Sequence, residues 1–434
     1  MHTRLKGRVR ALLEGGARGT TGTAHHFIRR GLVMGEVAFA VMLVTGAGLL
    51  VRTVSNLTTV DAGFDRSRLV TFSMTLPEGT YPQPSTRAQT YQRLLGELRA
   101  VPGVQAGTAM SGLPPNRTND SSNTWFANYT GSADADFWRK SGMVTVDYYQ
   151  FVMSNYFETM GIPIVEGRSF QRTDAGSEGL VAVVNETFAK TFWPGLNPIG
   201  QRLRHCCGDE DPWSRVIDVA KDVKQNGVDQ KTWSELYILV EQYADARARN
   251  TQYLPLTMNV VLRTTLPPTA LSPTIERVVT DVDPTVPIVR LRNMDAVFAE
   301  SISRPTLLAQ LVGAFAGLAL LLAAIGTYGV LAYMVAERRR EIGIRLALGA
   351  DRSTVLADVM KRGLQLTIVG IVIGLAGAFG LNRLMASLLF GVQPTDPTTL
   401  VAVTLTITLV AAVACWLPAW RASRLDPNAV LRAE

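Results

Sequence analysis

The sequence has few of the residues from which soluble enzymes usually build active sites. It contains 3 cysteines and 4 histidines among 434 residues, which leaves little for acid–base or thiol chemistry. No Gly-Lys dipeptide occurs, so the chain lacks a Walker-type phosphate-binding loop. The motifs His-Glu-x-x-His and Gly-x-Ser-x-Gly are absent as well. We therefore expect a non-catalytic chain that holds no cofactor and does not hydrolyse ATP.

Two of the three cysteines are adjacent and follow a histidine, in His205-Cys206-Cys207. This tract could bind a soft metal ion, but it supplies only three ligands, and no second cluster follows at ligand spacing. A local disulfide or two ordinary thiols is the simpler interpretation, so we expect no metal site. The third cysteine, Cys415, lies in an apolar run and is expected to be a small packing residue.

Charged residues are also scarce, at 18% of the chain against about 25% in ordinary soluble domains. The scarcity is concentrated in four apolar runs, and ~20 apolar residues suffice to cross a bilayer as a helix. Transmembrane helices are predicted at 31–52, 305–336, 364–384 and 397–420. A cleaved signal peptide is the alternative for the first run, but no clear cleavage site precedes Arg52. The second run is longer than a bilayer needs, so we expect it to project beyond the lipid.

Basic residues predict the orientation of these spans, because short cytoplasmic loops carry an excess of lysine and arginine. The leader 1–30 and the loop 337–363 each contain seven basic residues, whereas the short loop 385–396 contains none. We expect an inner-membrane protein with both termini and the 337–363 loop in the cytoplasm. Residues 52–306 have a net charge of −2 and the remainder +9. The basic excess thus lies beside anionic lipid, which argues against a nucleic-acid partner.

Residues 53–304 predict a large extracytoplasmic α+β domain, so the fold class is a four-helix membrane protein with one such domain. Two β-α-β units are expected to pair into one subdomain near the membrane. Their elements are predicted at 69–76, 85–100 and 104–110, and at 258–266, 268–281 and 286–291. Residues 145–250 are expected to form a second, inserted subdomain. Its strands are predicted at 181–184, 214–220 and 235–240, and its helix at 185–193 with Asn185 as the N-cap.

Two features inside the predicted spans are candidates for function. Glu36 is the single charged residue of the first span, and intramembrane carboxylates are often functional. It lies about six residues from the cytoplasmic edge, so contact with interfacial water is the alternative. Small residues at four-residue spacing let helices approach closely in lipid. They occur as Gly313 and Gly317 in the second span and as Gly370 and Gly374 in the third.

The loop 337–363 reads ERRREIGIRLALGADRSTVLADVMKRG and mixes apolar with basic residues. It is either an amphipathic segment on the membrane surface or a docking element. Its first part, Glu337–Ala350, resembles the loop of FtsX/MacB-type ABC transporter permeases. The tail PAWRASRLDPNAVLR at 418–432 resembles the same family. YFETMG at 156–161, EGR at 166–168 and NPIG at 197–200 resemble the MacB periplasmic core domain.

The resemblance covers roughly residues 10–434. Residues Leu12–Gly19 and Glu36 resemble the second half of the duplicated orphan permeases described in acidobacteria. Such permeases pair with a cytosolic P-loop ATPase and a second permease unit. They transmit motion from the ATPase to the external domain, in efflux or envelope export. The resemblance implies that the loop is the ATPase-coupling segment, with contact residues Glu341, Ile342, Gly343, Arg345, Leu346 and Gly349.

The chain departs from the family in two ways. The MacB type carries a fused ATPase, and the duplicated permeases have two units in one chain; this chain has neither. It is therefore expected to be a genuine half-permease, a product of gene splitting or a fragment, and a remnant would be inactive alone. A membrane-anchored binding or sensory protein that needs no ATPase is the competing interpretation, although the cytoplasmic parts are too short to fold as an output domain.

Overall fold

The computed structural model describes residues 20–132, 134–176, 179–205, 212–243, 254–348 and 350–424. The predictions for the leader before Thr20, for Cys206 and Cys207, for Gly349 and for the tail after Arg424 lie outside these residues. The chain divides into two compact units. The helical unit comprises Met1–Thr58 and Arg304–Glu434, and the α/β unit comprises Thr59–Ser303.

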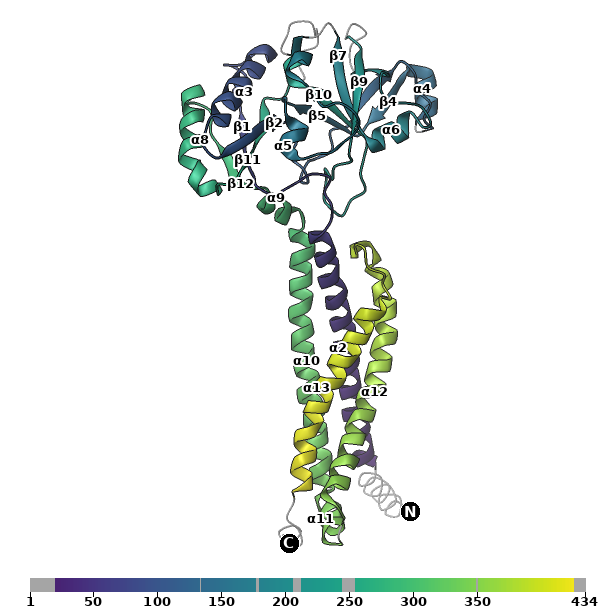
Figure 1. The fold of residues 1–434 in the computed structure, drawn as a ribbon. Helices are drawn as coiled ribbons and strands as arrows, with labels where there is room; N and C mark the ends of the chain where they lie inside the picture. The colour runs from purple at the N-terminus through teal and green to yellow at the C-terminus, as the bar shows by residue number, and fades with distance from the viewer. Residues whose placement is uncertain are drawn as a thin grey trace, which may run out of the picture. The chain divides into compact units, whose positions relative to one another are not determined.

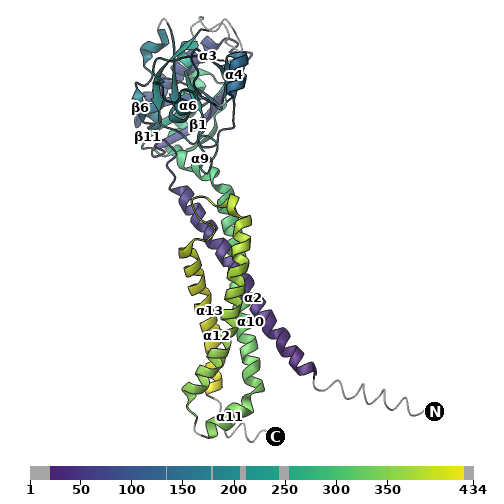
Figure 2. The ribbon, with the colours of Figure 1, turned by 90° about the vertical axis from the view of Figure 1, so that its right-hand side faces the viewer.

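Among the residues that the structure describes, the helical unit contains four helices that are long and apolar enough to cross a membrane (Figure 1). They are α2 (Thr20–Thr58), α10 (Ser303–Glu337), α12 (Arg352–Leu384) and α13 (Pro397–Ser423). The short helix α11 (Arg339–Ala347) lies between α10 and α12, and η3 (Ala386–Leu388) follows α12 (Figure 2). The 35 residues of α10 correspond to roughly 52 Å at 1.5 Å per residue, against a hydrocarbon core of ~30 Å. Length does not single out α10, however, because α2 has 39 residues.

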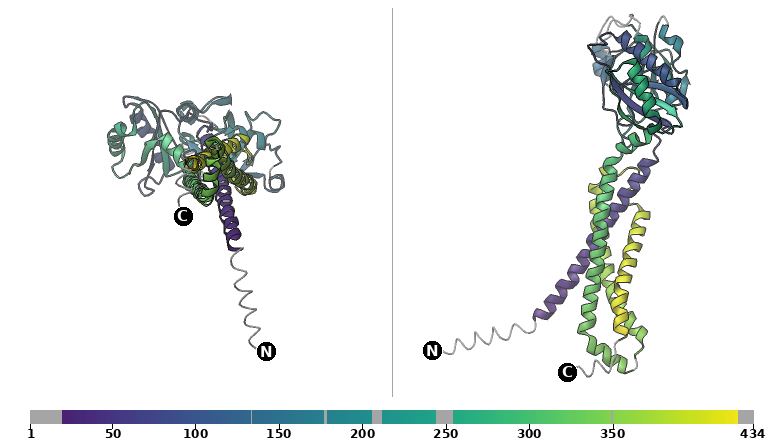
Figure 3. Two further views of the ribbon diagram at one scale, coloured as in Figure 1. Left: turned by 90° about the horizontal axis from the view of Figure 1, so that it is seen from below. Right: turned by 90° about the vertical axis from the view of Figure 1, so that its left-hand side faces the viewer.

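All four long helices contribute to one apolar cluster of the helical unit. Val37 and Val41 of α2 pack with Ala323 of α10, Ile371 of α12 and Ile407 of α13. Figure 3 shows α2 and α10 crossing, with α12 and α13 beside them. The residues that α10 buries recur along one face, and most of them are small: Ala309, Ala316, Ala319, Ala323, Thr327 and Leu331. Its large apolar side chains, such as Phe315 and Leu318, are exposed, as expected for a surface that faces lipid.

The α/β unit is built on one 12-stranded sheet with the order β12-β1-β11-β2-β5-β10-β7-β9-β8-β3-β4, and β6 pairs with β9. Both predicted β-α-β units are present, and their strands are neighbours in the sheet. The first is β1 (Leu69–Thr75), α3 (Pro84–Arg99) and β2 (Val104–Met110). The second is β11 (Thr257–Thr264), α8 (Pro268–Val282) and β12 (Val289–Asn293), followed by α9 (Met294–Ser301). β12 begins three residues later than predicted.

The rest of the sheet lies between these units in sequence. Its strands are β3 (Ser122–Phe126), β4 (Met143–Val146), β5 (Tyr148–Val152), β6 (Ile164–Gly167), β7 (Leu180–Asn185), β8 (Arg202–His205), β9 (Ser214–Ala220) and β10 (Glu235–Leu239). Its helices are α4 (Ala135–Ser141), α5 (Tyr156–Met160), η1 (Arg172–Gly176), α6 (Glu186–Phe192) and α7 (Val240–Tyr243). Asn185 caps α6 as predicted, by accepting a hydrogen bond from the Phe188 N–H.

The inserted part differs from the prediction in two respects. It includes β3, which lies before the predicted start at residue 145. The short polar sequence of β3, SNTWF, shows little of the alternation that marks a strand. The inserted part also continues the sheet of the first part, because β2 pairs with β5 at Met110 and Val152. Two apolar cores form, one under α3 and α8 and one around Phe126, Phe188 and Trp193, and Phe151 packs against both.

Candidate functional site

The predicted coupling segment folds into α11, which the other helices hold in place. Its Ile342 is 8% exposed and packs with Leu331 of α10, Val355 and Val359 of α12, and Ala419 of α13. Gly343 is buried, and Leu346 is half-buried against the same cluster. Since three long helices end on this cluster, α11 is an integral part of the helical unit at the end where α10 meets α12.

The opposite face of α11 is open and combines charged with apolar side chains. Glu341 accepts a hydrogen bond of 2.5 Å from the Arg345 guanidinium one turn later. Ile344 is 41% exposed and Leu348 is 83% exposed. We refer to Glu341, Ile344, Arg345 and Leu348 as the α11 outer face.

Of the predicted ATPase-contact residues, Ile342 and Gly343 are buried inside the chain, whereas Glu341 and Arg345 are exposed. Ile342 packs α11 against α10, α12 and α13. Ile344 and Leu348 were missed as exposed candidates. The apolar residues at 342, 344, 346 and 348 recur every second position, but a helix turns by about 100° per residue and divides them between two faces.

The predicted small-residue pairs have different surroundings. On α12, a Cβ added at Gly370 would lie 2.8 Å from the Val37 Cβ, and one at Gly374 would lie 2.5 Å from the Val41 Cβ. These glycines therefore allow α12 to approach α2 closely. On α10, a Cβ at Gly313 or Gly317 would meet nothing within 4 Å among the described residues.

Glu36 contacts α10 through another glycine. Its carboxylate lies where a Cβ of Gly326 would be, so only glycine leaves room for it at that position. One carboxyl oxygen, Oε2, is buried and accepts no hydrogen bond from any described residue. An open apolar groove of about 460 Å³ beside it is lined by Phe39, Leu43, Phe315, Leu318, Ala319 and Leu322. Glu36 is thus a helix–helix contact residue between α2 and α10.

Polar contacts that no local sequence pattern predicts join α2 to the loop before α13. Arg52 forms an ion pair with Asp396, and Asn56 Nδ2 donates to the carbonyls of Phe390 and Gly391. Asp396 also caps α13, and hydrogen bonds from Thr399 and Thr398 lower the pKa of its carboxyl to about 2. This carboxylate therefore stays charged at any physiological pH.

Two family models match the chain, and together they cover its long helices and its α/β sheet. Residues 31–278, more than half of the chain, match the MacB-like periplasmic core domain. Residues 313–427 match the FtsX-like permease C-terminal region. The chain belongs to the FtsX/MacB-type family of ABC transporter permeases. The predicted fold class is confirmed, and the permease is a multi-pass membrane protein. The likeness to duplicated acidobacterial permeases stays a prediction.

Two relatives that match in sequence agree with this assignment. The permease is 28% identical over 300 residues to the macrolide export ATP-binding/permease protein MacB of Hahella chejuensis, covering 65% of this chain and 42% of that protein. It is 24% identical over 288 residues to the uncharacterized ABC transporter permease YknZ of Bacillus subtilis, covering 65% and 69%. The periplasmic region of MacB from Actinobacillus actinomycetemcomitans aligns with a TM-score of 0.36 and 14% identity, over 56% of this chain and 95% of that one. The permease thus spans less than half the length of the Hahella protein.

Proposed function

We propose that this chain is a non-catalytic permease subunit that couples ATP hydrolysis by a separate cytosolic P-loop ATPase to motion of its α/β unit. The observation that carries the proposal is α11, whose inner face is fixed to three long helices while its outer face is open. A push on this face would act directly on α10. Since α10 leads in sequence from α11 to the α/β unit, it is the segment suited to transmit the motion.

The family membership supports the rest of the proposal. The Hahella relative is named as an export protein with an ATP-binding part, and this chain contains no Gly-Lys dipeptide with which to bind ATP itself. A second permease unit, identical or related, would complete the complex within the membrane. The basic excess outside residues 52–306 supports cytoplasmic termini and a cytoplasmic α11. We infer efflux or envelope export as the transport class.

The outer face can be tested with two exposed leucines at opposite ends of α12. Leu348, just before α12, is 83% exposed, and Leu384, its last residue, is 81% exposed. We expect Leu348→Ser to reduce the amount of P-loop ATPase that co-purifies with the tagged chain from native membranes. Leu384→Ser removes the same side chain far from α11 and should leave the amount unchanged.

A charge exchange separates the partner contact from the stability of α11. The double variant Glu341→Arg/Arg345→Glu keeps an ion pair within the helix but reverses the charges offered to a partner. We expect it to lose the ATPase while the chain keeps its unfolding temperature. If both variants retain an active complex, the outer face is not the coupling surface. If the wild-type chain retains no ATPase, the competing interpretation of a binding or sensory protein, or of an inactive remnant, takes its place.

A further inference from the structure

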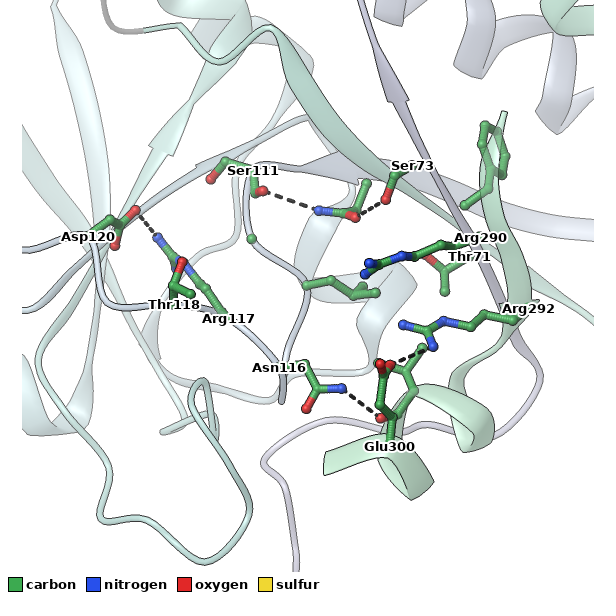
Figure 4. A pocket seen from close by; sticks show the side chains of 15 residues that line it. Thr71, Ser73, Ser111, Asn116, Arg117, Thr118, Asp120, Arg290, Arg292 and Glu300 are labelled. Atoms are coloured by element: carbon green, nitrogen blue, oxygen red, sulfur yellow. Dashed lines mark hydrogen bonds and ion pairs between the residues drawn. The ribbon is translucent and has the colours of Figure 1, made fainter. Parts of the chain in front are cut away.

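The α/β unit contains a polar cavity of about 540 Å³ that the proposed coupling does not use. It lies between the edge strand β12, the segment that follows β2, and α9 (Figure 4). Its volume is in the range of small-molecule sites, about 300–1,000 Å³. Two arginines of β12, Arg290 and Arg292, point into it (Figure 4). A third, Arg117, is neutralised at the far wall by Asp120 and Glu235.

A bulge in β12 places these two side chains in the cavity. Thr71 of β1 pairs with Arg292, and Ser73 pairs with Val289, so two steps along β1 match three along β12. Arg290 lies in the extra step with φ at +58°. Residues other than glycine rarely adopt this conformation. Bulges of this kind re-aim side chains and recur beside functional sites.

The charges around the cavity leave Arg290 available to a ligand. Arg292 donates to Glu300 at 2.6 Å, while its Nε is buried and donates to no acceptor among the described residues. No ion pair or hydrogen bond joins the Arg290 guanidinium to another described residue (Figure 4). The cavity therefore combines one unopposed guanidinium with a second one that still has an unused donor.

We propose that this cavity binds a small solute through an oxyanion, either a carboxylate or a phosphate. A guanidinium presents two parallel N–H donors that match the two oxygens of such a group. Arg290 supplies the charge that the protein does not neutralise, and the unused Nε of Arg292 adds a donor. Glu300 competes with the ligand for Arg292 and so limits the affinity. The proposal does not depend on an ATPase partner.

The test is a titration of the full-length chain in a non-ionic detergent at constant ionic strength. Inorganic phosphate and succinate are the two probes, and isothermal titration calorimetry measures binding. We expect saturable binding of at least one probe, and the ratio of the two affinities distinguishes a phosphate from a carboxylate site. Absence of saturable binding by both probes overturns the proposal.

Arg290→Gly separates binding from folding. Glycine adopts the φ of position 290 without strain, so the unfolding temperature should stay the same or rise while the affinity falls at least tenfold. Glu300→Gln should strengthen binding, since it removes the competing carboxylate. Arg277→Ala deletes an exposed arginine of α8 and should change the affinity little. Unchanged binding by Arg290→Gly, or an equal loss with Arg277→Ala, would show that the cavity is not the site.

Discussion

The two units of this permease are held together by different kinds of packing. In the helical unit, glycines of α12 lie against α2, and Glu36 lies against Gly326 of α10. In the α/β unit, aromatic rings fill much of the inserted core, and an arginine and a glutamate are buried together. Lipid tails are as apolar as leucine, so helices in a membrane associate through close packing. In water, burial of apolar area drives folding, and the core can then hold polar groups that satisfy each other.

The glycine pairs of α10 and α12 extend this comparison within the helical unit. The same spacing gives a tight contact at Gly370 and Gly374 but an open surface at Gly313 and Gly317. Spacing alone therefore permits close packing and does not show where it occurs.

The strongest test of the comparison is to remove the arginine of the buried pair. Arg117 Nη1 lies 3.2 Å from Glu235 Oε1, with side chains 4% and 1% exposed. Gln225 Nε2 and the Tyr237 hydroxyl also donate to Glu235. Arg117→Leu leaves the carboxylate buried without its cation, which should cost about 3–5 kcal/mol of unfolding free energy. Chemical denaturation of the chain in detergent, followed by tryptophan fluorescence, measures the loss.

The pH dependence of this loss identifies its cause. Burial raises the pKa of Glu235 to about 7 even with Arg117 present. Without the arginine the pKa rises further, so the folded state binds a proton that the unfolded state releases above its ordinary carboxyl pKa. Both chains should therefore lose stability as pH rises from 5 toward 7, and above pH 7 the loss should continue in the variant but level off in the parent chain. Arg117→Leu/Glu235→Leu should recover most of the loss, and a double variant as unstable as the single one would refute the ion-pair account.

The second test compares one substitution at two glycines. Gly374→Val places a side chain against the Val41 Cβ and within 2.7 Å of the Ala38 carbonyl oxygen. Such overpacking should cost roughly 1–3 kcal/mol and lower the yield of monodisperse protein in size-exclusion chromatography. A Cβ added at Gly317 would meet nothing within 4 Å, so Gly317→Val is the matched control. Equal damage from both variants would mean that α10 is as tightly packed as α12.

The sequence predicted the parts of this structure that depend on local patterns. Apolar run length identifies α2, α10, α12 and α13, and alternation identifies β1. The pairing of β10 with β5 and the contact of Arg117 with Glu235 join residues far apart in sequence, and no local pattern encodes them. The exposed Ile344 and Leu348 of the α11 outer face and the position of Gly326 beside Glu36 were missed because both depend on how helices turn and pack.

The third test concerns the contact of Glu36 with Gly326. Gly326→Ala introduces a methyl group where the Glu36 carboxylate lies, and we expect a cost of about 1–2 kcal/mol. Glu36→Ala removes the carboxylate, so the double variant should be more stable than Gly326→Ala alone. A double-mutant cycle of unfolding temperatures measures this coupling. Strictly additive effects would show that the two residues do not touch.

The smallest expected effect is a gain of stability in the α/β unit. Both carboxyl oxygens of Asp218 on β9 are buried without a regular hydrogen bond among the described residues. Burial raises the Asp218 pKa to about 7; the Val219 N–H and Arg168 offset this only in part, and Glu158 adds to it. The Asp218 carboxyl therefore contributes its full stabilisation below the ordinary pKa of an aspartate, where it is neutral. This contribution to the free energy of unfolding is lost as pH rises toward 7.

Asp218→Asn removes the charge but keeps the shape of the side chain. It should leave the unfolding temperature unchanged at pH 5, where Asp218 is neutral, and raise it by about 2–4 °C at pH 8. Thermal scans of the chain in detergent at both pH values measure the difference. Asp281→Asn on the exposed surface of α8 is the control and should shift neither value. If Asp218→Asn lowers stability at pH 8, the carboxylate has a stabilising partner, and the α/β unit satisfies its buried charges more completely than its hydrogen bonds indicate.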